Sequence, residues 1–188
     1  GPCFHLSFDD GFRNILTNAA PVLSELAIPG LVFVPTAFVG ATMEQAREYC
    51  VDIARYSNPI EMMSWIDLKT LVAAGWEVGS HTRQHVRCSE VSNDSAYLSR
   101  EILGSKQDIE EHLGRGCRYI AWPFGTQADI DQFSLQLIRD VGYSACFGAF
   151  RAPIRFGETD LYQIPRHNFS PEWPLAHVCY FAAGNRES

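Results

Sequence analysis

Residues 63–81 read MSWIDLKTLVAAGWEVGSH and contain a complete helix-to-strand unit. Ser64 and Asp67 resemble a capping box, with Asp in place of the usual Glu, so a helix is expected to begin here. The helix ends before Gly75, a residue type typical of the position just after a helix. The letters WEVGS then indicate a strand that leads directly to His81. This stretch predicts a helix, a turn and a strand in succession.

The same alternation continues on both sides of this unit. Apolar runs bounded by turn residues predict strands, and apolar residues at helical spacing predict helices. Because strands and helices alternate, we expect an α/β fold with a parallel sheet, open or closed into a barrel. The expected strands are 3–8, 31–39, 76–80, 118–122, 143–150 and 160–165, and the expected helices are 14–26, 42–56, 64–74, 94–113 and 129–141.

Length, charge and hydropathy narrow the class of protein. The chain has 188 residues, which suits one domain, and 46% of them are hydrophobic, which allows a core of ordinary size. The formal net charge is -7 and the Lys and Arg residues are scattered, so nucleic acid and anionic membranes are not expected partners. No apolar run approaches the roughly 20 residues of a membrane span, and no signal-peptide pattern opens the sequence.

The six cysteines form no C-x-x-C pair, and their spacing suggests neither a zinc knuckle nor a small disulfide scaffold. We expect most of them to be buried as small hydrophobic residues, which leaves a reducing, cytoplasmic compartment open. They are Cys3, Cys50, Cys88, Cys117, Cys146 and Cys179.

Polar residues follow several of the predicted strands at their C-terminal ends. In parallel α/β folds these ends meet at one edge of the sheet, where functional sites form. The residues concerned are Asp9 and Asp10, Ser80 and His81, Pro123 to Gly125, and Arg166 and His167.

His81 and His85 stand four residues apart, a spacing that places two imidazoles on one face of a helical turn. With a carboxylate from Asp9 or Asp10 they would form a two-histidine, one-carboxylate metal site with an open position for water. Zinc is the first expectation for such donors, with cobalt, nickel or iron as alternatives. The competing interpretation is two unrelated surface histidines and an ordinary Asp-Gly turn.

The adjacent carboxylates of Asp9 and Asp10 have a physical explanation in such a site. One of them would bind the metal, whose positive charge offsets the repulsion between two neighbouring acids. The other would stay free and act as a general base toward an attacking water.

Three motifs in this order resemble those of the polysaccharide deacetylases, also called carbohydrate esterase family four. They are SFDDGF (7–12), SHTRQH (80–85) and AWPFG (121–125), and the likeness covers most of residues 4–150. The resemblance implies a distorted (β/α) barrel with fewer than eight parallel strands. It implies metal-dependent removal of N-acetyl, or sometimes O-acetyl, groups from an acetylated glycan. It also implies a bacterial cell envelope or secreted location.

The resemblance assigns roles to individual residues. Asp9 would be the general base, and Asp10, His81 and His85 would be the metal ligands. The backbone N–H of Phe124 would stabilise the oxyanion of the reaction.

The residues around Phe124 are expected to bind substrate. Pro123 would set the turn, Gly125 would complete it, and Trp122, Phe124 and Trp173 could stack on sugar rings. The alternative is an ordinary turn at the end of a strand, with the aromatic rings used for packing.

Two departures from the family pattern matter. Many members carry an Arg two residues before the Pro of the third motif, and this chain has Ala121, which places it nearer the exopolysaccharide deacetylases. We expect Arg166 to hold Asp9 instead, by a charge-assisted hydrogen bond, the alternative being an ordinary ion pair. No late Leu-x-His motif supplies the catalytic acid. His167 is the candidate, His177 is a weaker one, and His5 in the first strand is expected to be a core histidine.

The whole chain, 1–188, is expected to be one catalytic domain with a helical insertion at 41–60. This insertion lies on the route toward the active edge and would shape the substrate groove, or would be a plain surface helix. The expected function is removal of N-acetyl groups from an amino sugar of a poly- or oligosaccharide, with release of acetate. The alternatives are a carbohydrate O-acetyl esterase and a carbohydrate-binding protein without catalytic activity. Neither the glycan nor the oligomeric state follows from the sequence.

Overall fold

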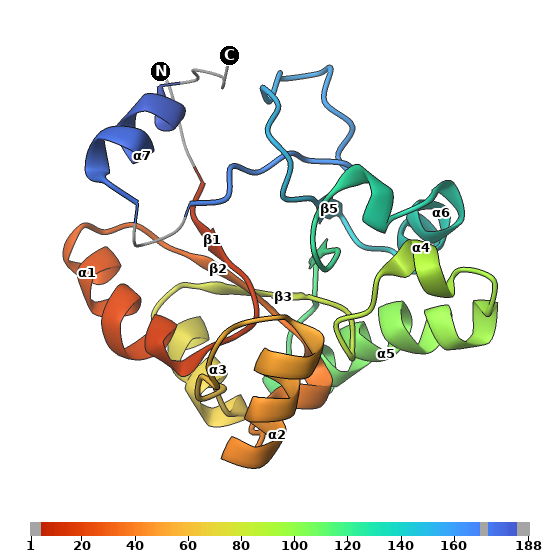
Figure 1. Cartoon of the computed structure of the whole chain (residues 1–188), viewed down its shortest axis with the longest axis horizontal. Coiled ribbons are helices and arrows are strands. Elements are labelled where there is room, and N and C mark those ends of the chain that lie inside the picture. Colours follow the sequence, from red (N-terminus) through yellow and green to blue (C-terminus); the bar gives the residue numbers. More distant parts are fainter. Residues whose placement is uncertain (1–4, 170–172, 184–188) are drawn as a thin grey trace.

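The computed structural model of the chain describes residues 5–169 and 173–183. In this part of the chain, five parallel strands form one sheet in the order β1-β2-β3-β4-β5, which is also their order along the sequence. Helices lie around the curled sheet (Figure 1), so the distorted barrel with fewer than eight parallel strands is confirmed. The strands are β1 Ser7–Phe8, β2 Leu31–Val34, β3 Glu77–Ser80, β4 Tyr119–Ala121 and β5 Ala145–Phe147.

The expected helices are present, and several are divided into shorter elements. Pro21, which has no N–H to donate, lies near the change from the π-type to the α-type turns of the first helix. The helical elements are η1 Ile15–Ala19, α1 Ala20–Glu25, η2 Thr36–Phe38, α2 Met43–Arg47, η3 Glu48–Ile53, α3 Trp65–Ala73, α4 Cys88–Val91, α5 Ser95–Leu113, η4 Gln127–Asp129, α6 Gln132–Asp140 and α7 Leu175–Ala182.

The helix, turn and strand of residues 63–81 form as predicted. Ser64 Oγ accepts a hydrogen bond from the N–H of Asp67 at 3.2 Å, and the Asp67 carboxylate accepts one from the N–H of Ser64 at 2.8 Å. Gly75 has a φ of 88°, a conformation that glycine adopts without the steric cost of a Cβ. The turn therefore delivers β3 into the centre of the sheet, between β2 and β4.

The strand expected over 160–165 is wrong as a regular strand. Its only β contact among the described residues is an isolated parallel bridge between Phe147 and Ile164. The N–H of Tyr162 is turned back onto the Asp160 side chain at 2.9 Å, and Pro165 has no N–H to contribute. The strand expected over 31–39 is also shorter than predicted, because β2 ends before Pro35.

The core packs the helices against the sheet. All four residues of β2 are buried, as expected for a parallel strand covered on both faces. Cys50, Cys88, Cys117 and Cys146 are buried free thiols, whereas Cys179 is exposed, and Cys3 lies outside the described residues. The prediction that most cysteines are buried is thus confirmed for the described part of the chain.

His5 is exposed, so its prediction as a core histidine is wrong. β1 begins only at Ser7, so His5 precedes the strand and is not enclosed by the sheet. Among the described residues, no helix combines the length and the hydrophobicity required to cross a bilayer.

Candidate active site

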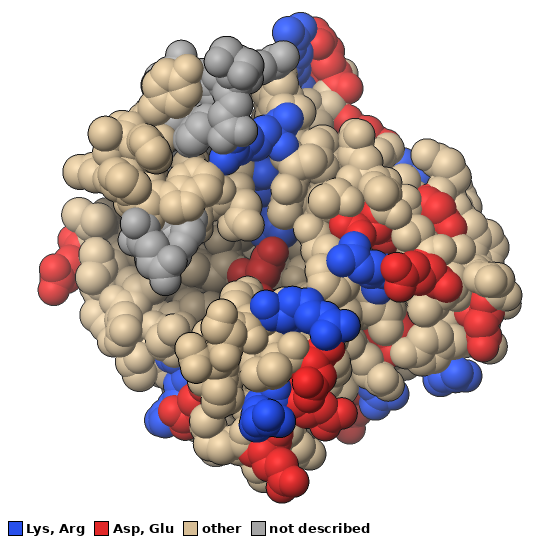
Figure 2. Space-filling model, in the orientation of Figure 1, with Lys and Arg blue, Asp and Glu red and all other residues tan. Residues whose placement is uncertain are grey.

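The polar residues that follow the strands meet at one edge of the sheet. Asp9 and Asp10 follow β1, His81 follows β3, and Phe124 lies just beyond β4. Figure 2 shows acidic atoms at the floor of a hollow on this face, with basic side chains at its border. Because the strands are parallel, their C-terminal ends meet at one edge of the sheet, and the site lies there as predicted.

Asp10, His81 and His85 form a compact, buried cluster. Their candidate ligand atoms all lie within 4.8 Å of one another. Oδ1 of Asp10 is 3.4 Å from Nε2 of His85 and 3.7 Å from Nε2 of His81. Asp9 stands to one side, with its Oδ2 3.9 Å from Nε2 of His81. The structure thus brings Asp10, rather than Asp9, between the two imidazoles.

Three residues of the site adopt backbone conformations that are costly for side chains other than glycine. The φ angles are 71° at Asp10, 59° at His85 and 63° at Phe124. Such left-handed conformations persist only where the surrounding structure enforces them, and they concentrate at functional sites. Here they occur at two of the three clustered residues, Asp10 and His85, and at Phe124 beside them.

The donor set suits a divalent cation. Nδ1 of His81 donates a hydrogen bond to the carbonyl of Ala121 at 2.8 Å, so its Nε2 lone pair faces Asp10. Burial lowers the pKa of His81, which favours the neutral, ligating form of the ring. Burial by itself would raise the pKa of Asp10, but hydrogen bonding from His85 and the charges of both imidazoles hold it below its ordinary value. Two imidazole nitrogens and a buried carboxylate fit a borderline metal such as zinc.

Glu101 of α5 supports the loop that carries the histidines. Its side chain is 1% exposed, and Oε2 accepts hydrogen bonds from the N–H groups of Arg83 and Gln84 at 3.0 and 2.7 Å. Sequence reasoning missed this residue. The sequence did contain a signal for it: Glu101 lies three residues after Leu98, on the apolar face of the helix, where an acid needs a buried partner.

Arg166 holds the carboxylate of Asp9 with both arms of its guanidinium. The two hydrogen bonds measure 2.7 and 2.8 Å, and the same guanidinium also donates to the carbonyl of Gly148 at 2.7 Å and to Ser7 Oγ at 3.0 Å. Burial would raise the pKa of Asp9, but the charge of Arg166, followed by that of His81, holds it below its ordinary value. The sequence prediction that Arg166 contacts Asp9 is thereby met by a bidentate pair.

Phe124 lies beside the cluster. Its ring packs edge-on against His85 with centroids 4.9 Å apart, and the Arg87 guanidinium lies 3.6 Å above it. The described residues offer no hydrogen-bond acceptor to its N–H. The turn is fixed behind it, because Gly125 has a φ of 78° and a Cβ there would lie 2.3 Å from that of Ala149. Pro123 is buried in the same turn.

Trp122 does not face the hollow, so the prediction that it stacks on sugar is wrong. Its side chain is 1% exposed, and its indole N–H donates to the carbonyl of Thr126 at 2.9 Å. It stacks instead on Phe150, with centroids 6.1 Å apart. A residue at a strand end can point to either face, and the sheet here turns Trp122 into the core.

Neither candidate acid is hydrogen-bonded to the cluster in the part of the chain that the structure describes. His167 has a buried Nδ1 without a hydrogen-bond partner and stacks on Phe169 at 6.1 Å, with no contact to the two carboxylates. His177 is exposed on α7. Trp173 packs edge-on against Phe169.

The segment 41–60 is not a plain surface helix, because two of its tyrosines reach Asp10. Tyr49 in η3 donates its hydroxyl hydrogen bond to Oδ1, and Tyr56 donates to Oδ2 at 2.6 Å. Sequence reasoning missed both residues. Nothing in the local pattern distinguishes them from ordinary packing tyrosines, since their partner lies far away in the chain.

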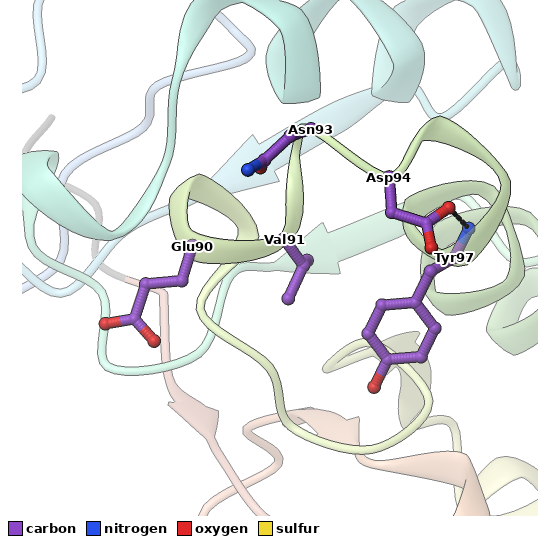
Figure 3. Close-up of a pocket in the computed structure, with 5 residues that line it drawn as sticks. All are labelled: Glu90, Val91, Asn93, Asp94 and Tyr97. Atoms are coloured by element: carbon purple, nitrogen blue, oxygen red, sulfur yellow. Dashed lines mark hydrogen bonds between the residues drawn. The ribbon is translucent and has the colours of Figure 1, made fainter.

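A second depression lies at the start of α5 (Figure 3), and it is lined by Glu90, Val91, Asn93, Asp94 and Tyr97. The Asp94 carboxylate accepts a hydrogen bond from the N–H of Tyr97 at 2.9 Å and caps the helix. This acid therefore serves the helix end.

Comparison with known proteins agrees with the fold. Residues 1–146 match the family model described as polysaccharide deacetylase, so the chain belongs to this family and is a hydrolase of the deacetylase type. No curated protein matches the chain.

Several solved structures are similar. IcaB from Ammonifex degensii is 26% identical, with a TM-score of 0.72 over 89% of this chain and 68% of that one. The deacetylase PplD of Streptococcus pyogenes, in complex with acetate, is 18% identical, with a TM-score of 0.73 over 93% and 68%. A de-N-acetylase from Aggregatibacter actinomycetemcomitans is 16% identical, with a TM-score of 0.69 over 94% and 74%. The last two likenesses concern the fold alone.

Proposed function

We propose that this chain is a metal-dependent de-N-acetylase, acting as one catalytic domain on an N-acetylated amino sugar of a poly- or oligosaccharide. The observation that carries the proposal is the cluster of Asp10, His81 and His85, with a second carboxylate, Asp9, beside it. The family supports a deacetylase, and a similar fold belongs to a de-N-acetylase.

Asp10, His81 and His85 would hold the ion, with zinc as the first candidate and cobalt or nickel as alternatives. When bound, a divalent cation polarises a carbonyl and lowers the pKa of water to roughly 7. Both imidazoles present Nε2 toward Asp10, which supports this ligand set.

Asp9 would take the proton of the attacking water. Its pKa lies below the ordinary value, so it is ionised at neutral pH, which is the form that a general base requires. Arg166 would keep both oxygens in place through its bidentate contact. Fixing the base in this way lowers the cost of reaching the reactive geometry.

The N–H of Phe124 would donate to the oxyanion that forms on the acetyl carbon. Two observations support this role: the turn geometry at Phe124, and the lack of a backbone acceptor for its N–H among the described residues. Loss of one such donor typically raises a barrier by about 3 kcal/mol. Pro123 and Gly125 would hold this turn beside the substrate.

His167 is the proposed source of the proton for the leaving amine. It follows Arg166 directly in the chain, and its buried Nδ1 has no hydrogen-bond partner among the described residues. A protonated imidazole there would let the sugar leave as a neutral amine.

The test is a metal-reconstituted assay on oligosaccharides that carry either N-acetyl or O-acetyl groups. Acetate and new free amine are expected in equal amounts, and His81→Ala is expected to abolish both. His112→Ala is the matched control, because His112 is exposed and stacks on Trp65 with centroids 4.1 Å apart, away from the cluster. Acetate release without new amine would instead support an O-acetyl esterase. Metal binding without any acetate release would support a carbohydrate-binding protein.

A further inference from the structure

Both carboxylate oxygens of Asp10 are hydrogen-bonded by phenols from the segment 41–60. Tyr49 donates to Oδ1, and Tyr56 donates to Oδ2 at 2.6 Å. A phenol is protonated at neutral pH and acts as a donor toward a carboxylate. The orientation of this carboxylate is therefore determined by residues outside the strand that carries it.

The two oxygens face different surroundings. Oδ1 points toward the imidazoles, 3.4 Å from Nε2 of His85 and 3.7 Å from Nε2 of His81. The hydrogen bond of Oδ2 is with Tyr56. Oδ1 is therefore the oxygen of Asp10 that lies beside the Nε2 atoms of both histidines.

The phenols are themselves held firmly. Tyr49 is fully buried and packs edge-on against His85, with centroids 5.5 Å apart. Its ring is also tilted against that of Phe38, with centroids 4.7 Å apart. Tyr56 packs edge-on against Phe12 at 5.3 Å.

The backbone that carries the phenols is tied back as well. The N–H of Tyr56 donates to the carbonyl of Cys50 at 2.6 Å, and Sγ of Cys50 accepts from the N–H of Ile60 at 3.3 Å. The segment therefore presents both hydroxyl groups from a fixed frame.

We propose that Tyr49 and Tyr56 are positioning residues that fix Asp10 so that only Oδ1 is presented to the metal. This inference rests on the proposed function and deepens its metal site. Groups that hydrogen-bond a metal-ligating residue typically change metal affinity by about 10- to 100-fold.

The geometry has a consequence for the metal centre. A carboxylate that ligates through one oxygen leaves positions free for water and for the acetyl carbonyl, as a catalytic site requires. If Oδ2 were released, the same carboxylate could bind through both oxygens and occupy one of those positions. In this arrangement the segment 41–60 does more than border the site, because its two tyrosines control how Asp10 binds the metal.

The experiment measures Zn²⁺ affinity of the metal-stripped protein by competition with a chromophoric chelator. Tyr49→Phe and Tyr56→Phe are each expected to bind Zn²⁺ about 10-fold more weakly, and the double variant about 100-fold. Tyr162→Phe is the matched control, because it removes a phenol hydrogen bond of 2.7 Å to the carbonyl of Tyr143. Its affinity is expected to equal that of the wild type.

A second readout distinguishes positioning from general loosening of the fold. Co²⁺ absorbs visible light more weakly as its coordination number rises, so Tyr56→Phe loaded with Co²⁺ is expected to show a weaker band than the wild type. Thermal unfolding of the metal-free variants identifies a variant that does not fold. If Tyr49→Phe does not fold, Tyr56→Phe decides the question alone.

The outcomes separate this inference from the proposed function. If wild type binds Zn²⁺ tightly and both folded variants bind it equally well, the positioning role is wrong and the metal site stands. If wild type binds no Zn²⁺, Co²⁺ or Ni²⁺, the proposed function is wrong and the positioning role falls with it.

Discussion

Replacing Arg166 with Gln removes the guanidinium that holds both oxygens of Asp9. The side chains of Arg166 and Asp9 are 13% and 30% exposed, so the pair is partly shielded from water. Breaking a fully buried pair costs about 3 to 5 kcal/mol, whereas an exposed pair contributes about 0 to 1 kcal/mol. The change also removes the hydrogen bonds to Gly148 and Ser7. We therefore expect a loss of about 2 to 4 kcal/mol in the free energy of unfolding at neutral pH.

The sign of the pH dependence follows from the lowered pKa of Asp9. Its folded-state pKa lies below that of the unfolded chain, so the pair contributes fully above the unfolded value of about 3.9. That contribution is lost as the pH falls through the folded value. The difference between wild type and Arg166→Gln should therefore be largest near neutral pH and should shrink in acid.

Urea denaturation at a series of pH values measures this difference. Arg139→Gln is the matched control, because Arg139 pairs with Asp160 at the same 2.8 Å but on the surface, with side chains 31% and 44% exposed. The control should lose at most about 1 kcal/mol. A loss in Arg166→Gln no larger than in the control, or one that stays constant into acid, would refute the reasoning. Deacetylation by Arg166→Gln should fall about 100-fold, since the base is no longer held in position.

Three further predictions concern single residues. Asp9→Asn should lower kcat by about 100- to 10,000-fold and leave Zn²⁺ affinity unchanged, and weakened Zn²⁺ binding would show that Asp9 is itself a ligand. Glu101→Leu should lower the free energy of unfolding by about 1 to 3 kcal/mol, because the N–H groups of Arg83 and Gln84 lose their buried acceptor, whereas Glu111→Leu on the exposed face should change it by less than about 0.5 kcal/mol. Gly125→Ala should cost about 1 to 3 kcal/mol in urea denaturation, because its φ is positive and its Cβ would meet Ala149; an unchanged midpoint would contradict this.

Features that depend on neighbours in the chain were predictable from the sequence. The helix start at Ser64 and Asp67 needs only residues three apart, and the turn at Gly75 needs only one residue that tolerates a positive φ. The meeting of Asp10 with His81 was also predictable. The ends of parallel strands share one edge, so a pattern along the chain fixes which side chains gather there.

Features that depend on packing between distant segments were not predictable. The side chain of Trp122 points into the core because of the way the sheet packs against its helices, and the neighbouring sequence does not specify this. Tyr49 and Tyr56 meet Asp10 across 39 and 46 residues of chain. The pattern around each tyrosine is equally typical of a core residue.

The sequence by itself determined the alternation of strands and helices, the parallel sheet and the residues at its active edge. Periodicity, capping and turn chemistry act over a few residues and can be read directly from the letters. The contact of Arg166 with Asp9 was also predicted, but only the tertiary structure showed that it is bidentate. The tertiary structure alone decided that two phenols surround the carboxylate of Asp10. Such contacts arise only when the chain closes long loops, so their partners are chosen by the packed fold as a whole.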